Sequence, residues 1–312
     1  MENASPTFLS IGECMIEIRG DFVGSYRKGF AGDCFNTAYY FHACAETHWT
    51  SQFFTAVGDD KISDEMLSFM QSVGVQTTYV SRIPNKSVGL YMIETDKGER
   101  SFQYWRSMSA ARYMLSGQTL SVPVEAADII FVSGITLAIL PEQQRAELLD
   151  TLFRARAGGK IVAFDPNLRP RLWETSTAMR YWIMKFGAAS SIVLPSFSDE
   201  AEAFGDSSSR QTIERYRTAG AQHITVKNGD QPVLFDDGQS IGSVEVSPAI
   251  QVVDSTSAGD AFNGAYLAQI ANGAETRGAI TFAAAISCQV IAQHGAITPI
   301  NTKVVDKRAN LT

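Results

Sequence analysis

The sequence contains few histidines and cysteines and no long apolar or basic run. Its four cysteines and four histidines are scattered without paired or metal-ligand spacing, so we expect no zinc site. This cysteine usage favours a reducing, cytoplasmic compartment. The first thirteen residues lack the basic flank and apolar core of a signal peptide, and no uncharged stretch is long enough to cross a bilayer. We therefore expect no membrane partner.

The charge balance also restricts the function. The 312 residues carry 26 basic and 33 acidic side chains, a formal net charge of −7. Without a basic run, nucleic acid is not an expected partner. A hydrophobic content of 45% at this length instead suits a soluble globular enzyme with a large core.

Short apolar runs alternate with helical patterns along most of the chain. The buried strands are predicted at residues 128–133, 160–165, 190–194 and 223–227, and the helices between them at 141–157, 177–186 and 209–219. Such alternation predicts an α/β fold with a parallel sheet and helices on both faces. We see no internal repeat and expect residues 1–312 to form a single domain.

The sheet topology predicts where the site lies. Ligands of open α/β sheets bind beyond the carboxyl ends of the strands. In this sequence that rule selects one rim, made of residues 133–134, 165–169, 195–199 and 227–229.

Two regions interrupt the alternation. Residues 10–19 and 89–104 are rich in strand-forming residues, and a turn at 96–98 divides the second region into a hairpin of 89–94 and 100–104. The hairpin is expected to be either a lid over the site or an edge extension of the main sheet.

The segment 254–262, DSTSAGDAF, places two small residues before Asp260 where a helical pattern begins. The first N–H groups of a helix are unpaired and attract anions, and small residues let a phosphate approach them closely. A carboxylate beside such a cradle is placed to take a proton from an attacking hydroxyl. The alternative is an ordinary acidic cap.

This segment resembles the DTxGAGD signature of the ribokinase-like (PfkB) carbohydrate kinases. Residues 30–40, FAGDCFNTAYY, resemble the glycine-rich sugar-binding segment of the same family. The resemblance runs from about residue 8 to about residue 300. It implies a three-layer sandwich with a mostly parallel central sheet, and a small β lid from about 12–30 and 88–106. It also implies ATP as phosphoryl donor, with Mg²⁺ held mostly by ATP phosphates and water.

Other segments resemble the 2-keto-3-deoxygluconate kinases of that family. They are IGECMIEI (11–18), GLYMIET (89–95), FQYWRSMSAAR (102–112), SGITLAIL (133–140) and FDPNLRPRLW (164–173). The implied sugar-acid contacts are Glu13, Gly32, Asp33, Asn36, Tyr91, Tyr104, Arg106, Arg169 and Asp260. Arginine's planar fork suits a carboxylate, although a single arginine more often forms a surface ion pair. Glu17 is expected to face solvent.

The nucleotide side of the predicted site departs from the family pattern. The implied ATP contacts are Ser196, Lys227, Gly229, Ala258 and Gly259, with Lys227 open to the alternative of an outward-facing charge. Ser257 replaces the usual glycine, but its N–H can still join Ala258 and Gly259 in an anion hole. Pro232 replaces a second glycine of the turn. Asp199 lies where relatives carry an Asn-x-x-Glu pattern, and we treat it as an indirect magnesium candidate.

Together these features predict ATP-dependent phosphorylation of 2-keto-3-deoxygluconate to its 6-phosphate, with Asp260 as the general base. The alternatives are a fructokinase or another PfkB sugar kinase and, in a different class, a non-catalytic sugar-acid sensor. The hairpin carries more apolar surface than it can hide alone, which predicts a homodimer or higher homo-oligomer built through the lid strands.

Overall fold

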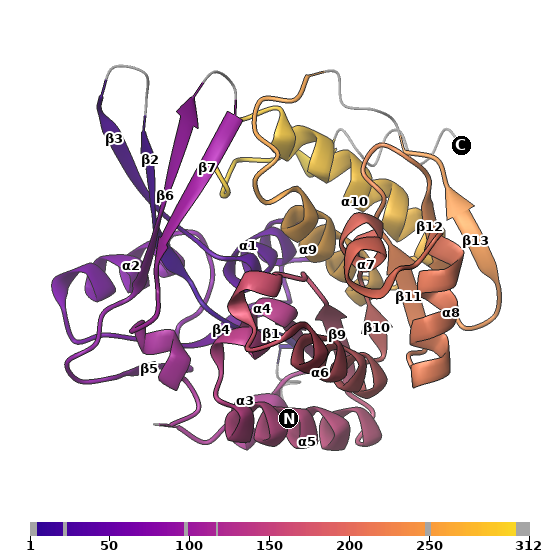
Figure 1. The fold of residues 1–312 in the computed structure, drawn as a ribbon, viewed down its shortest axis with the longest axis horizontal. Helices are drawn as coiled ribbons and strands as arrows, with labels where there is room; N and C mark the ends of the chain where they lie inside the picture. The colour runs from indigo at the N-terminus through magenta and orange to yellow at the C-terminus, as the bar shows by residue number, and fades with distance from the viewer. Residues whose placement is uncertain (1–4, 21–23, 97–98, 117, 247–250, 304–312) are drawn as a thin grey trace.

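The computed structural model describes residues 5–20, 24–96, 99–116, 118–246 and 251–303. Within these ranges the chain forms a large mixed sheet and a smaller second sheet (Figure 1). The helices are α1 (Asp33–Cys44), α2 (Lys61–Ser72), α3 (Ser121–Ala126), α4 (Gly134–Ile139), α5 (Glu142–Ala157), α6 (Ser176–Ala189), α7 (Phe197–Phe204), α8 (Ser209–Ala219), α9 (Ala258–Ala271) and α10 (Thr276–Ile291).

The large sheet has the strand order β13-β12-β11-β10-β9-β8-β1-β4-β5 in the described part of the chain. Its strands are β1 (Thr7–Ile11), β4 (Thr50–Val57), β5 (Val80–Arg82), β8 (Ile129–Ser133), β9 (Ile161–Asp165), β10 (Ile192–Val193), β11 (His223–Val226), β12 (Val233–Asp236) and β13 (Ile241–Val244). The pairs from β5 to β11 are parallel. The pairs β11–β12 and β12–β13 are antiparallel, so β12 alone of these strands runs against the others. The predicted α/β class and the four predicted strands are therefore confirmed.

Helices cover both faces of this sheet, and each face has its own core. In β8, Ile129 and Phe131 pack on the side of α1, α9 and α10, whereas Ile130 and Val132 pack on the side of α5, α6 and α8. This two-residue alternation is the geometry of an extended strand. The two buried layers hold the carboxyl ends of the strands in fixed positions.

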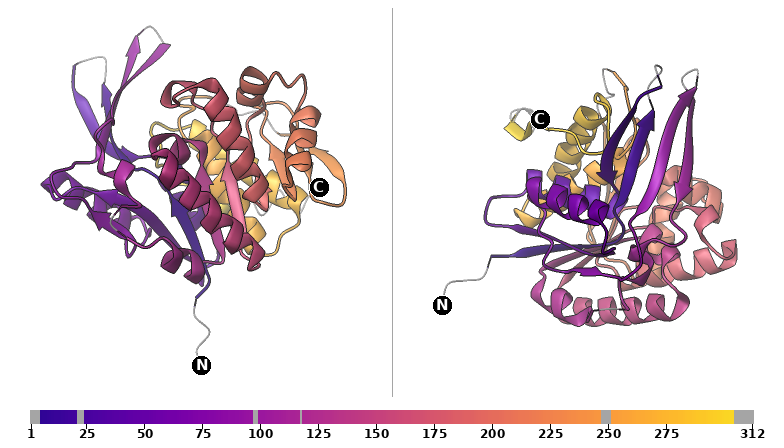
Figure 2. Two further views of the ribbon diagram at one scale, coloured as in Figure 1. Left: turned by 60° about the horizontal axis from the view of Figure 1, so that its bottom comes forward. Right: turned by 90° about the vertical axis from the view of Figure 1, so that its left-hand side faces the viewer.

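The second sheet consists of β2 (Met15–Gly20), β3 (Tyr26–Ala31), β6 (Gly89–Asp96) and β7 (Glu99–Trp105), in the order β3-β2-β6-β7. The far ends of its strands project beyond the helical layers (Figure 1 and the left view of Figure 2). At its base, Phe30 of β3 packs against Phe69 of α2. The hairpin was thus correctly predicted, but the edge-extension alternative is wrong because β6 pairs with β2 and not with the main sheet. The strand-rich region 10–19 contains parts of two strands that belong to different sheets, since β1 ends at Ile11.

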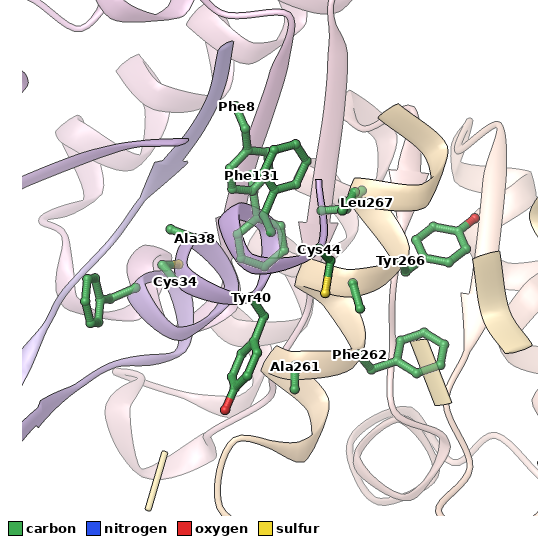
Figure 3. Packing of buried hydrophobic residues seen from close by; sticks show 14 of the residues in the cluster. Phe8, Cys34, Ala38, Tyr40, Cys44, Phe131, Ala261, Phe262, Tyr266 and Leu267 are labelled. Atoms are coloured by element: carbon green, nitrogen blue, oxygen red, sulfur yellow. The ribbon is translucent and has the colours of Figure 1, made fainter. Parts of the chain in front are cut away.

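Helices α1 and α9 pack closely, with Tyr40 of α1 near Ala261 of α9 (Figure 3). Asn36 of α1 also donates a hydrogen bond to Asp260 in the first turn of α9. A Cβ on Gly264 would lie 2.6 Å from the Thr37 carbonyl oxygen and 2.7 Å from the Phe41 nitrogen. Because only glycine fits this approach without a shift, Gly264 lets the two backbones come together. The first turn of α9 is thereby brought against the start of α1.

Candidate active site

A cavity of about 670 Å³ lies between the predicted rim of the large sheet and the second sheet. Its lining includes Glu13, Gly32, Asp33, Asn36, Tyr91, Tyr104, Arg106, Arg169, Ser196, Asp199, Lys227, Ser257, Ala258, Gly259 and Asp260. Gly229 lines an adjoining cavity. The structure therefore brings every predicted site residue to one of two neighbouring cavities at the carboxyl ends of the strands.

Asp260 lies in the first turn of α9, as the sequence predicted. The side-chain amide of Asn36 donates a hydrogen bond of 2.8 Å to its carboxylate, so α1 orients this group. Burial and then the nearby charges of Asp33 and Asp165 raise the pKa of Asp260 to about 7, against the opposing effects of Asn36 and Lys227. A carboxylate with such a pKa is a stronger base than an ordinary aspartate and is still ionised to a useful extent near neutral pH.

Ser257 precedes α9 in a left-handed conformation with φ of 66°. This backbone region favours glycine, which accounts for the glycine of the family pattern. Serine at this position departs from that pattern. The turn directs the start of α9 into the cavity. We call Ser257, Ala258 and Gly259 the anion-binding turn, because the first N–H groups of a helix have no intrahelical acceptor.

Lys227 closes one side of this turn. Its ammonium contacts the Asp165 carboxylate at 2.7 Å and the Asn263 side-chain oxygen at 3.0 Å, and a Cβ on Gly259 would lie 3.7 Å from it. The lysine side chain is only 11% exposed. The alternative of an outward-facing charge is therefore wrong, and Lys227 adds positive charge beside the anion-binding turn.

Asn263 and Asp165 were not singled out as site residues from the sequence. The Asn263 amide donates a 2.6 Å hydrogen bond to Asp165, so both of its polar atoms are used in the network around Lys227. Asn263 lies one helical turn after Asp260. This spacing was the sequence signal that could have placed Asn263 beside Asp260 in the site.

Glu13 and Arg106 form a buried ion pair at the base of the second sheet. The Ser109 hydroxyl donates a further hydrogen bond of 2.5 Å to Glu13. The Glu13 carboxylate, which we expected to hold a sugar hydroxyl, is thus already bound by protein groups, although it still lines the cavity. The Arg106 Nε is buried and has no hydrogen-bond partner among the described residues.

The expectation that Glu17 faces solvent is wrong. Glu17 is buried, accepts a hydrogen bond from the Tyr91 hydroxyl and pairs with Arg19 at 3.2 Å. Its strand position lies directly opposite Tyr91 in β6, so the carboxylate supports a wall of the cavity instead of contacting water.

Arg169 and Asp199 form an ion pair of 3.2 Å at the mouth of the cavity. The arginine side chain is 50% exposed, so it is free to exchange this partner for a ligand at small cost. Nearby, the Asn167 side-chain amide donates a hydrogen bond of 2.8 Å to the Asp33 carboxylate. This bond connects the loop after β9 with the start of α1.

The adjoining cavity of about 400 Å³ suits a nucleotide. Apolar side chains line it, namely Val233, Val246, Val252, Phe262, Ala284 and Ile291, and it shares Ser196, Lys227, Ser255, Ala258 and Gly259 with the first cavity. An apolar slot for a base that opens onto an anion-binding turn fits the geometry of ATP.

The next question is whether protein side chains could hold a magnesium ion directly. No group of three histidine, cysteine, aspartate or glutamate side chains that could hold a metal occurs in the part of the chain that the structure describes. Asp199 is paired with Arg169, and burial, as the largest cause, raises its pKa. The residues present therefore suit a metal held by ATP phosphates and water, with at most indirect help from Asp199.

The pfkB family carbohydrate kinase pattern matches residues 6–303. This chain belongs to that family. The kinase is 37% identical over 302 residues to the 2-dehydro-3-deoxygluconokinase of Dickeya dadantii, with 93% of this chain and 96% of the relative covered. It is 36% identical over 268 residues to the enzyme of the same name from Haemophilus influenzae, with coverage of 82% and 84%.

Solved structures share the fold of this kinase. A putative ribokinase II from E. coli, crystallised in complex with ATP and Mg²⁺, superposes with a TM-score of 0.83 at 20% identity, covering 97% of this chain and 99% of that one. The ribokinase-like fold predicted from the sequence is confirmed. A search of the described helices finds none that is long and apolar enough to span a membrane.

The raised pKa of Asp260 predicts a pH dependence. A protonated carboxyl group cannot accept a proton, so kcat/KM of the kinase should fall as the pH drops below about 7 and level off above it. Asp33→Asn removes a negative charge that raises this pKa and should shift the inflection to lower pH. Initial-rate profiles between about pH 5 and 9 check this. A kcat/KM that stays constant across this range would contradict the assigned role, because an ordinary aspartate would remain ionised throughout it.

Proposed function

We propose that this kinase transfers the γ-phosphoryl group of ATP to 2-keto-3-deoxygluconate and forms the 6-phosphate. The observation that carries the proposal is the position of Asp260, a group with raised pKa that lines the polar cavity. It directly follows Ala258 and Gly259, which line both this cavity and the apolar one. The names of the relatives at 36–37% identity support the choice of sugar acid.

In the proposed reaction, Asp260 takes the proton of the terminal hydroxyl as that oxygen attacks the γ-phosphorus. The bond to the β-γ bridging oxygen breaks, and ADP leaves. The anion-binding turn and Lys227 stabilise the charge on the transferred group. Magnesium bound to the phosphates would neutralise part of this charge.

The second sheet would act as a lid in this reaction. Tyr91, Phe102 and Tyr104 line the cavity from its strands, and their rings would exclude water that could otherwise accept the phosphoryl group. We expect residues 1–312 to form a single domain of which this lid is a part.

The sugar-acid carboxylate would bind Arg106 and Arg169. Arg106 and Arg169 both line the first cavity, and the exposed Arg169 pair with Asp199 exchanges readily. Glu13 holds the Arg106 guanidinium in place from behind. Fixed arginines bind a sugar acid more tightly than a neutral sugar, because charge-assisted hydrogen bonds are stronger than neutral ones.

The experiment that tests the function is ATP consumption against 2-keto-3-deoxygluconate, fructose and related sugars. We expect the acid to have the highest kcat/KM. Faster turnover of fructose would favour a fructokinase. Binding of the acid without ATP consumption would favour the sensor, which would have no use for a base beside a phosphate cradle.

Substrate choice is tested with Arg169→Ala. Loss of a charge-assisted contact of about 1.5–3 kcal/mol should raise KM for the sugar acid about ten-fold or more and change fructose kinetics little. Arg171→Ala is the matched control, because Arg171 is exposed in the same loop and outside the cavity lining. Arg106→Lys, which keeps a charge for Glu13, should act in the same direction. An equal rise in KM for the sugar acid and for fructose would show that the arginines are structural.

The second sheet would also mediate dimerisation. Tyr26, Trp105 and Met108 are 57%, 54% and 64% exposed on its strands and the loop after β7. Exposed apolar side chains on these elements would be covered by two-fold pairing of two such sheets. A homodimer, or a higher homo-oligomer, is therefore part of the proposal. The need for ATP and the four dispersed cysteines support a cytoplasmic location.

Light scattering at micromolar concentration tests the oligomer. We expect at least twice the 34.0 kDa chain mass, and Trp105→Glu should lower it by placing a charge in the interface. A wild-type monomer with full activity would show that these apolar side chains serve no interface.

A further inference from the structure

A chain of polar contacts connects the sugar cavity with the loop that leads into α9. The Tyr91 hydroxyl, at the cavity wall, donates to Glu17, and Glu17 accepts from Arg19. Arg19 in turn donates to Asp254, the first residue of the DSTSAGD segment. Arg19 contacts neither cavity, and the reaction described above does not use it.

Asp254 receives contacts from three directions. Besides Arg19, its carboxylate accepts hydrogen bonds from the N–H of Thr256 at 2.9 Å and of Gly295 at 3.1 Å. Burial opposes the ionised form, but these donors and Arg19 hold the pKa of Asp254 well below its usual range. The same carboxylate therefore shapes the backbone just before Ser257 and binds the second sheet.

Apolar packing reinforces this junction. Met15, Ala31, Tyr91 and Ile93 of the second sheet form a small buried cluster with Ala296, the residue after Gly295. The Arg19 and Asp254 side chains are 19% and 3% exposed, so their ion pair is shielded from solvent and stronger than a surface pair. The ion pair and the apolar cluster thus hold the second sheet and the loop at 254–256 in a fixed position relative to each other.

We propose that Arg19 is a positioning residue that couples the sugar cavity to the anion-binding turn, so that the two substrates bind cooperatively. A sugar that contacts Tyr91 fixes the Glu17–Arg19 pair, and Arg19 then orders Asp254 and the loop before Ser257. A nucleotide that binds an already ordered turn loses less conformational entropy. The inference rests on the proposed kinase function and names a residue outside the substrate contacts.

The test is isothermal titration with the β,γ-imido analogue of ATP, with and without saturating 2-keto-3-deoxygluconate. The ratio of the two dissociation constants is the coupling factor. For the wild type we expect about five-fold or more, the lower range of typical coupling between sites. Arg19→Gln should reduce this factor to within about two-fold of unity, because its amide cannot bind Glu17 and Asp254 with a charged fork.

Arg27→Gln is the matched control. Arg27 is exposed on β3 directly opposite Arg19, so this variant removes the same charge from the same sheet. It should keep the wild-type coupling factor and activity. Arg19→Lys retains the charge and should give an intermediate factor, and it serves as the test if Arg19→Gln does not fold.

Two results would overturn the inference. One is an Arg19 variant that binds each substrate more weakly but keeps the wild-type coupling factor, which is the signature of a purely structural role. The other is a wild type without coupling. Failure of the proposed function is distinguishable, because it shows in the wild type alone as absent turnover of the acid. If the wild type phosphorylates fructose instead, the coupling factor is measured with fructose.

Discussion

The burial of Asp260 beside two other carboxylates is the constraint on which this site depends. Asp33 and Asp165 raise its pKa, and the ammonium of Lys227 limits that rise. The arrangement requires the first turn of α9 to lie against α1, which Gly264 permits by its lack of a side chain. The same approach presents the start of α9 to an incoming phosphate. A single helix contact thus places the base and the anion-binding turn together.

The ion pairs around the cavities divide into two kinds. Lys227–Asp165 and Arg106–Glu13 are buried and serve as fixed scaffolding beside the reacting groups. Arg169–Asp199 is exposed and exchangeable. Because a buried pair keeps its geometry while a surface pair can open, the cavity has a rigid interior and an adaptable mouth. In the proposed function these would serve phosphoryl transfer and entry of the acidic sugar, respectively.

The sequence was sufficient to predict the fold class, the rim of the sheet and the position of Asp260 at a helix start. Strand periodicity and helix starts are local signals. Partners across the chain were not predictable. Lys227 meets Asp165 from 62 residues away, and nothing in the spacing of Glu17 revealed that Tyr91 would cover it. The first contact depends on the strand order of the large sheet, and the second on which strands become neighbours in the second sheet. The substrate contacts rested on family resemblance, and their roles remain predictions.

The central claim is that Asp260 removes the proton of the attacking hydroxyl. The most direct measurement is the single-turnover rate of Asp260→Asn with saturating sugar acid and ATP, alongside the dissociation constants of both. The account predicts a rate at least ~100-fold below the wild type, because the nearly isosteric amide cannot accept the proton, with both substrates still bound. A variant that turns over at a near-normal rate would contradict it.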